Sequence, residues 1–202
     1  MLEVPKTSKT RALLVNVARD LFAQKGKQHV TMNDIATTSG KSRRTLYTYF
    51  NNKNEIYLAV IENELDILIE CLQEVMERNI SPVKKLEAYF FTRFKVIKEA
   101  VTRNGSLKAD FFRNIYEVEK ARRPIDVKEI RMIKQILSAG IADGSFRIES
   151  PQWTAMLMLY AMKGIEAPYL NINIGNNIRD RRVQIMDFLM NGMMKKESGI
   201  GD

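Results

Sequence analysis

The sequence predicts an all-α protein in which a small N-terminal group of three helices precedes a larger helical part. No stretch of useful length alternates apolar and polar residues, as a half-buried strand would. Apolar residues instead recur at three- and four-residue spacing through most of the 202 residues. Gly, Pro, Asn and Ser fall between these segments, at positions where helices typically begin and end.

The first helix is expected from Lys9 to Gln24, after an N-terminal arm of residues 1–8. Gly26 ends it, because glycine readily adopts the positive φ found at helix C-termini. Its apolar side chains fall on one stripe, formed by Leu14, Val17, Ala18, Leu21 and Phe22. This helix is expected to be a scaffold that packs against the segment after it.

Two short helices joined by a tight turn are expected next. Thr31 and Asp34 have the spacing of a capping box for a helix over residues 32–39, and Gly40 can end that helix. Ser42 can cap the second helix, whose body reads RRTLYTYF. In that body Leu46 and Phe50 lie four residues apart, so they share one face and can pack inward.

The side chains left outward or sideways on the second short helix suit the major groove of DNA. Arginine can pair bidentately with guanine, threonine can touch a base edge, and tyrosine can bond to phosphate. Lys53 is a further candidate DNA contact. A lysine in the first turn of a helix is repelled by the helix dipole, and a phosphate beside it would reverse that cost. The candidate DNA contacts are Thr31, Ser42, Arg43, Arg44, Thr45, Tyr47, Tyr49 and Lys53.

Residues 35–53 carry the pattern I-A-x-x-x-G-x-S-x-x-T-L-Y-x-Y-F-x-x-K. This pattern resembles the helix-turn-helix of the tetracycline-repressor (TetR) family of bacterial transcriptional regulators, and the flanking segments KTRALLVNVARDLFAQKG and EIYLAVIENEL also fit. The resemblance covers the first quarter to third of the chain at motif level. It implies a helix-turn-helix domain over residues 1–53 and a helical effector-binding and dimerisation domain over residues 54–202.

The distribution of charge agrees with a DNA-facing N-terminal end. The chain has a net charge of +8, and residues 1–53 hold ten basic against three acidic side chains, a net +7. A solvated basic face is the alternative, but the helix-turn-helix pattern lies inside the basic segment. Double-stranded DNA is therefore the expected partner.

Further helices are expected along the rest of the chain. Asn52 with Glu55 caps a long helix that continues to about residue 79. Expected helices then cover residues 83–103, 107–116, 127–142, 151–170 and 178–195. Breaks are expected at Ser81-Pro82, Asn104-Gly105, Arg123-Pro124, Asp143-Gly144 and Ser150-Pro151, and the chain is expected to loosen at Pro168.

The last two of these helices are apolar over more than one stripe, which requires burial on two sides. One side can face the rest of the chain and the other a second copy, as the family resemblance also implies. The alternative is a single large core without a dimer. Candidate homodimer contacts are Trp153, Leu157, Tyr160, Ile185, Leu189 and Met193.

A pocket for an unknown small apolar or aromatic effector is a second expectation for the helical body, because aromatic residues and methionines gather there. The alternative for each residue is an ordinary place in the core. The candidates are Phe91, Phe94, Phe112, Tyr116 and Met162. A ligand-responsive regulator, most simply a repressor released by the effector, is the resulting hypothesis.

Other classes fit the sequence less well. It has one cysteine, Cys71, one histidine, His29, no Gly-rich phosphate loop and no nucleophile elbow, so no enzyme, metal site or cofactor is expected. Glu62, Glu64, Asp66 and Glu70 are expected on a solvated helix surface. No apolar run is long enough for a membrane helix, and a cytoplasmic location is expected. A helical protein-binding adaptor without specific DNA binding is the remaining alternative.

Overall fold

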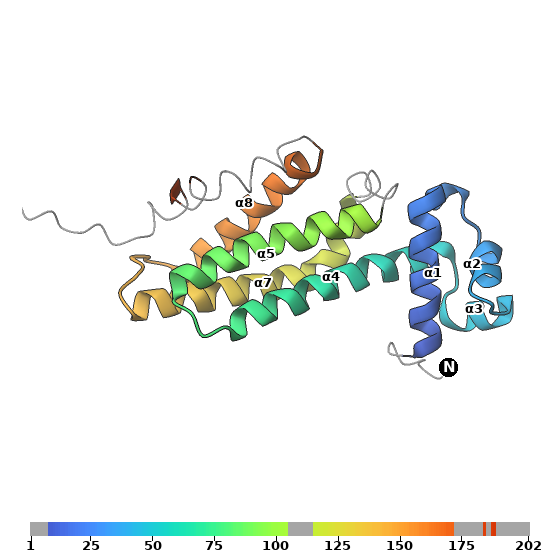
Figure 1. Ribbon diagram of the computed structural model, residues 1–202, viewed down its shortest axis with the longest axis horizontal. Coiled ribbons are helices and arrows are strands. Elements are labelled where there is room, and N and C mark those ends of the chain that lie inside the picture. The colour runs from blue at the N-terminus through green and yellow to red at the C-terminus, as the bar shows by residue number, and fades with distance from the viewer. Residues whose placement is uncertain (1–7, 105–114, 172–183, 185–186, 189–202) are drawn as a thin grey trace, which may run out of the picture. The chain divides into compact units, whose positions relative to one another are not determined.

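The computed structural model describes residues 8–104, 115–171, 184, 187 and 188, although not the side chains of 115–119 and 166–171. Over these ranges the elements are α1 (Lys9–Lys25), the 3₁₀ turn η1 (Lys27–His29), α2 (Met32–Thr38), α3 (Arg43–Tyr49), α4 (Lys53–Glu77), α5 (Pro82–Arg103), α7 (Ile115–Ala142) and α8 (Pro151–Asn171) (Figure 1). The all-α prediction is confirmed, since none of the described elements is a strand. The helices expected over 107–116 and 178–195 lie wholly or largely outside the described residues.

The predicted caps explain where the N-terminal helices begin and end. Thr31 accepts a hydrogen bond from the Asp34 amide at 3.1 Å, and the Asp34 carboxylate accepts one from the Thr31 amide at 2.8 Å. This reciprocal capping box starts α2, and Gly40 follows it at a φ of 64°. The Ser42 hydroxyl accepts from the Thr45 amide and starts α3. Gly26, at a φ of 80°, ends α1.

The break expected at Pro124 was wrong, and so was the loosening expected at Pro168, although the helix expected over residues 151–170 is present as α8. Pro124 lies inside α7, which runs unbroken from Ile115 to Ala142, and α8 continues past Pro168 to Asn171. A proline within a helix removes one N–H donor and disturbs the carbonyl four residues earlier, here that of Lys120. Both Lys120 and Pro124 are exposed, so water can hydrate that carbonyl. Burial of Ile125, Ile133 and Ile136 on the other face holds the helix together across the defect.

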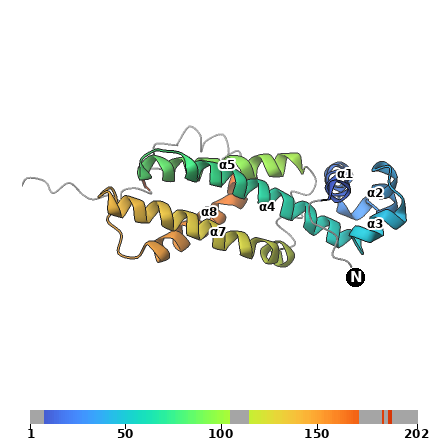
Figure 2. The ribbon, with the colours of Figure 1, turned by 90° about the horizontal axis from the view of Figure 1, so that it is seen from below.

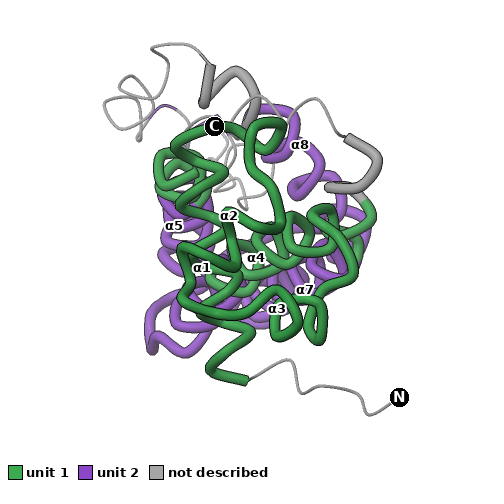
Figure 3. The backbone as a smooth tube through the Cα atoms, turned by 90° about the vertical axis from the view of Figure 1, so that its right-hand side faces the viewer, with its two compact units in different colours: residues 1–67, 97–123 green, residues 68–96, 124–202 purple. Residues whose placement is uncertain are grey.

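The chain divides into two compact units, which Figure 3 colours separately: unit 1 comprises Met1–Ile67 and Ile97–Arg123, and unit 2 comprises Leu68–Val96 and Pro124–Asp202. The N-terminal part of unit 1 has its own core. Its fully or nearly fully buried side chains include Leu14, Val15, Ala18, Phe22, Val30, Ile35, Leu46, Phe50, Ile56, Tyr57 and Val60. Val15 occupies the buried position that the expected stripe gave to Val17, which is half-buried. We call residues 8–60 the head.

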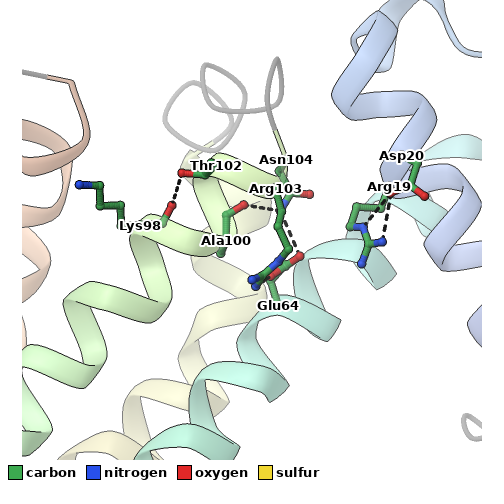
Figure 4. Close-up of polar contacts among 8 residues, drawn as sticks. All are labelled: Arg19, Asp20, Glu64, Lys98, Ala100, Thr102, Arg103 and Asn104. Atoms are coloured by element: carbon green, nitrogen blue, oxygen red, sulfur yellow. Dashed lines mark hydrogen bonds and ion pairs between the residues drawn. The ribbon is translucent and has the colours of Figure 1, made fainter.

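Unit 1 also contains a buried carboxylate that the sequence did not reveal. Glu64 on α4 is only 4% exposed, whereas Glu62, Asp66 and Glu70 are exposed as expected. The Arg103 guanidinium at the end of α5 donates to Glu64 at 2.7 Å, and the Asn104 amide donates to its other oxygen at 3.1 Å (Figure 4). The solvated position expected for Glu64 was therefore wrong, because two donors from a distant helix end replace its water.

Unit 2 is a helical bundle, in which Figures 1 and 2 show segments of α4, α5 and α7 side by side. Arg93 of α5 and Glu129 of α7 form an ion pair of 2.7 Å with both side chains almost completely buried. The Tyr89 hydroxyl donates to the same carboxylate at 3.2 Å. Burial, reinforced by the charge of Glu129, raises the pKa of Tyr89 far above its usual value, so this phenol stays a neutral donor. Lys163 of α8 donates to Asp126 of α7 at 2.8 Å.

Candidate nucleic-acid interface

Helix α3 divides its side chains between the core of the head and the surface. Leu46 is completely buried and Phe50 nearly so, which fixes the helix by one face. Arg43 and Arg44 are exposed at the first turn, and Tyr47 keeps 43% of its surface exposed. The start of the helix therefore presents two guanidinium groups and a phenol to solvent, as predicted. Such a helix start can enter a major groove, where guanidinium groups can reach base edges.

The three predicted serine and threonine contacts also lie at this surface, where their hydroxyls stabilise the starts of the short helices. Thr31 and Ser42 are exposed and Thr45 is half-buried. The hydroxyls of Ser42 and Thr45 are 2.9 Å apart, and the Thr31 hydroxyl donates to Asp34 at 2.8 Å. The Thr31 and Ser42 hydroxyls also accept hydrogen bonds from the amides of Asp34 and Thr45, which satisfies one backbone donor at the start of each helix. The two helix N-termini are thus stabilised before any DNA arrives.

Tyr49 has a structural bond that the sequence reading did not include. Its side chain is half-buried, and its hydroxyl accepts a hydrogen bond of 3.1 Å from the hydroxyl of Ser8, the N-cap of α1. Nearby, the Arg11 guanidinium lies 5.2 Å from the centroid of the Phe50 ring. Both contacts join the start of α1 to the end of α3 across about forty residues of sequence. No local pattern in the sequence signals such a pair.

Lys53 lies in the first turn of α4, as expected, but its ammonium already has partners in the head. It donates to the Lys27 carbonyl at 2.7 Å and to the Gln28 carbonyl at 3.4 Å. The repulsion between its charge and the helix dipole is therefore offset by two carbonyl dipoles. Lys53 has a structural role that the sequence argument missed, and its half-buried ammonium remains near the amide end of α4.

The acidic side chains described in the head are all engaged in local bonds. Asp20 pairs with Arg19 at 3.1 Å, and Glu55 accepts from the backbone and side chain of Asn51. Hydrogen bonds from the Thr31 amide and hydroxyl lower the pKa of Asp34. Arg43 and Arg44 make no ion pair with any described residue, so their positive charge faces solvent uncompensated.

The candidate dimer and effector residues are partly described. On α8, Trp153, Leu157 and Tyr160 are 59%, 54% and 54% exposed, whereas Ile185, Leu189 and Met193 lie outside the described residues. Among the effector candidates, Phe94 and Met162 are buried and Phe91 is half-buried. The Phe90 ring lies 5.2 Å from Phe91 and 4.8 Å from Phe94, centroid to centroid. Phe112 and the side chain of Tyr116 fall outside the described part of the chain.

The capped helix pair, the buried anchor of α3 and the exposed arginines at its start define a helix-turn-helix DNA-binding protein. Residues 14–60 match the family model for bacterial regulatory proteins of the tetR family. The N-terminal part of the chain therefore matches the tetR family of bacterial regulatory proteins, and the resemblance noted from the sequence is confirmed.

Known relatives agree with this assignment. The chain is 28% identical over 145 residues to the HTH-type transcriptional repressor KstR2 of Mycolicibacterium smegmatis, a match that covers 66% of each chain. A transcriptional regulator from Cytophaga hutchinsonii has the same fold, with a TM-score of 0.77 and 20% identity over 93% of this chain and all of that one. The solved SmeT–triclosan complex gives a TM-score of 0.71 and 17% identity, covering 96% of this chain and 95% of the other. None of the helices in the described ranges has the length and apolar character needed to span a bilayer.

Proposed function

We propose that two copies of this chain bind a palindromic operator duplex, repress transcription, and are released by a small apolar or aromatic effector. The exposed first turn of α3 is the observation that carries the proposal. Arg43 and Arg44 project from a helix that Leu46 anchors in the head, so the guanidinium groups can be held at a base edge. The proposed division of labour is residues 1–53 for DNA and 54–202 for effector and dimer, in the cytoplasm.

Dimerisation is part of the proposal because one short recognition helix reads few base pairs. Two half-sites about one DNA turn apart increase both affinity and specificity. The exposed apolar residues Trp153, Leu157 and Tyr160 recur at spacings of four and three on α8, which puts them on one face. A second copy packing on this face would remove their apolar surface from water, and Ile185, Leu189 and Met193 are proposed to join it.

The effector is proposed to bind in the helical body, among the candidates Phe91, Phe94, Phe112, Tyr116 and Met162. The contacts of the Phe90 ring with the rings of Phe91 and Phe94 support this choice, because adjoining aromatic rings offer both faces and edges to an aromatic or apolar ligand. The structurally similar SmeT forms a complex with triclosan. Release would follow if the effector favours a body conformation in which the two heads no longer match the half-site spacing.

Substitution of the two kinds of DNA-facing residue tests the proposal. Duplexes bound by the wild-type chain are first selected from a random pool. Arg44→Ala should then weaken binding by about 1–3 kcal/mol and relax base preference at one position of each half-site. Lys53→Ala should weaken all sequences about equally and reduce the slope of log Kd against log salt.

The matched control is Arg131→Ala, which removes the same side chain from an exposed position on α7 in the body. It should leave the affinity and the base preference unchanged. The proposal is wrong if Arg44→Ala and Arg131→Ala bind every selected duplex as the wild type does. A wild-type chain that retains no duplex at low salt would favour the protein-binding adaptor instead.

A further inference from the structure

Two lysines of the head interlock the turn η1 with the first turn of α4. The Lys53 ammonium donates to the backbone carbonyl of Lys27 at 2.7 Å. In the opposite direction, the Lys27 ammonium donates to the side-chain carbonyl of Asn54 at 2.7 Å and lies 3.8 Å from the centroid of the Tyr57 ring. We call the side chains of Lys27, Lys53, Asn54 and Tyr57 the clasp. Each segment thus contributes a cation that the other segment binds.

The clasp connects the surface of the head to its core. Tyr57 is completely buried, and its ring packs edge-on to that of Phe22 with centroids 6.3 Å apart. A lysine held over a buried ring and bonded to an amide oxygen loses much of the rotamer freedom of an exposed lysine. The first turn of α4 is therefore fixed to η1 by contacts that are partly shielded from solvent. The residues that form these two hydrogen bonds are 26 and 27 positions apart in the sequence.

The clasp consists of two cations, one amide and one phenol ring. Such a cluster concentrates positive charge at the amide end of α4, where the helix dipole already favours an anion. The cost of holding two ammonium groups near a helix N-terminus falls when a phosphate of DNA approaches. In the free protein, both ammonium groups are stabilised against the positive end of the helix dipole. Carbonyl oxygens accept hydrogen bonds from both lysines, and the face of the Tyr57 ring attracts the Lys27 ammonium.

We propose that Lys27 is a positioning residue for DNA binding, which acts by fixing the first turn of α4 and Lys53 against the head rather than by touching DNA. The proposal rests on the DNA contact proposed above for Lys53. Without the Lys27 ammonium, Asn54 and the Tyr57 ring lose their cation, and the first turn of α4 can shift relative to η1. The phosphate contact of Lys53 would then have to be ordered at the moment of binding, at the expense of affinity.

The test compares Lys27→Met with Lys27→Arg in the full chain on a selected duplex. Methionine keeps an apolar stem over Tyr57 and removes the ammonium, whereas arginine keeps a cation that can reach Asn54. We expect Lys27→Met to weaken binding roughly 3- to 10-fold, the net range of one hydrogen bond of ordinary strength, and Lys27→Arg to restore most of it. The slope of log Kd against log salt should equal that of the matched control Lys25→Met, which removes an exposed lysine two residues earlier.

Each other outcome overturns the proposal in a distinct way. A salt slope that falls by about one relative to Lys25→Met would make Lys27 a direct phosphate contact. An affinity equal to that of Lys25→Met would leave the clasp without a role in binding. Asn54→Ala, which removes only the acceptor, repeats the measurement if Lys27→Met does not fold, and it should lower affinity without changing the slope. A wild-type chain that binds no duplex rejects the proposed function itself, a failure separate from these.

Discussion

Single residues at the DNA-facing end of this molecule serve two purposes. Thr31 and Ser42 start the short helices and also lie on the surface proposed to meet DNA. Tyr49 and Lys53, which the sequence suggested as DNA contacts, hold bonds to Ser8 and to the carbonyl of Lys27. Local patterns predicted the caps because a cap depends on residues three positions apart. They did not predict the other bonds, which join residues 41 and 26 positions apart.

Acid should weaken the capping box of α2. The hydrogen bonds from Thr31 lower the pKa of Asp34 below 3.8, so its stabilising contribution is complete above that value and is lost as pH falls through the folded-state pKa. In urea unfolding series from pH 7 down to pH 3, Asp34→Asn should therefore be less stable than wild type at neutral pH, and the difference should shrink in acid.

Thr31→Val provides the comparison, because it keeps the backbone donor to Asp34 and removes only the hydroxyl. Its difference from wild type should be present at pH 7 and decline over the same acidic range. A stability difference for Asp34→Asn that stays constant or grows as the pH is lowered would contradict the assignment of the capping box as an ionic bond.

At the scale of the helix, most boundaries followed from the sequence, and the exceptions have physical causes. Glycine and Ser-Pro pairs marked the ends of α1, α2 and α4 within about two residues, because those residues act through their own backbone. Pro124 and Pro168 did not end their helices. Around Pro124, tertiary burial of the other face outweighs the one lost hydrogen bond. Local patterns did not indicate the charge pairs either. Glu64 was expected on a solvated surface, and nothing in the sequence singled out Arg93 or Glu129, yet each is buried with a partner on another helix.

Replacing Pro124 should stabilise α7. Pro124→Ala restores an N–H donor to the Lys120 carbonyl and removes the steric conflict of the ring, at an exposed site where no packing is lost. We expect the free energy of unfolding to rise by about 1–3 kcal/mol, measured by urea denaturation at fixed protein concentration.

Ser138→Ala, at another exposed position on α7, controls for the general preference of helices for alanine. It should change stability by only a few tenths of a kcal/mol. If Pro124→Ala gains no more than Ser138→Ala, then the proline costs the native helix nothing, and hydration of the Lys120 carbonyl with burial of the opposite face does not explain its tolerance.

At the scale of the whole molecule, the described helices expose one apolar face that a single chain leaves in water. Trp153, Leu157 and Tyr160 are each more than half exposed, although the opposite face of α8 buries Ala155, Leu159 and Met162. The sequence predicted this face because α8 is apolar most of the way round, which one core cannot satisfy. It did not reveal the effector, since the candidate residues Phe91, Phe94 and Met162 follow the same helical spacing as any core residue.

A charge on this face should separate the two copies. Leu157→Arg is expected to yield a monomer by analytical ultracentrifugation and to weaken operator binding by on the order of 100-fold or more, because the second half-site no longer adds to the first. Val127→Arg is the matched control, as Val127 is 58% exposed on α7 and lies off this face. It should remain a dimer with wild-type affinity. Dimers that survive Leu157→Arg would show that α8 is not the interface.

Helix α4 carries one more consequence for how this molecule can be divided. Its 25 residues run without a break, with Tyr57 and Val60 in the core of the head and Leu72 and Val75 buried in unit 2. A protease cut or a gene fusion placed directly after the helix-turn-helix would strip the Tyr57 ring from Phe22 and leave an opened core. A chimaera that joins this DNA-binding head to another effector-binding domain should therefore not be fused at residue 53. It should include the first turns of α4, whose side chains complete the core of the head.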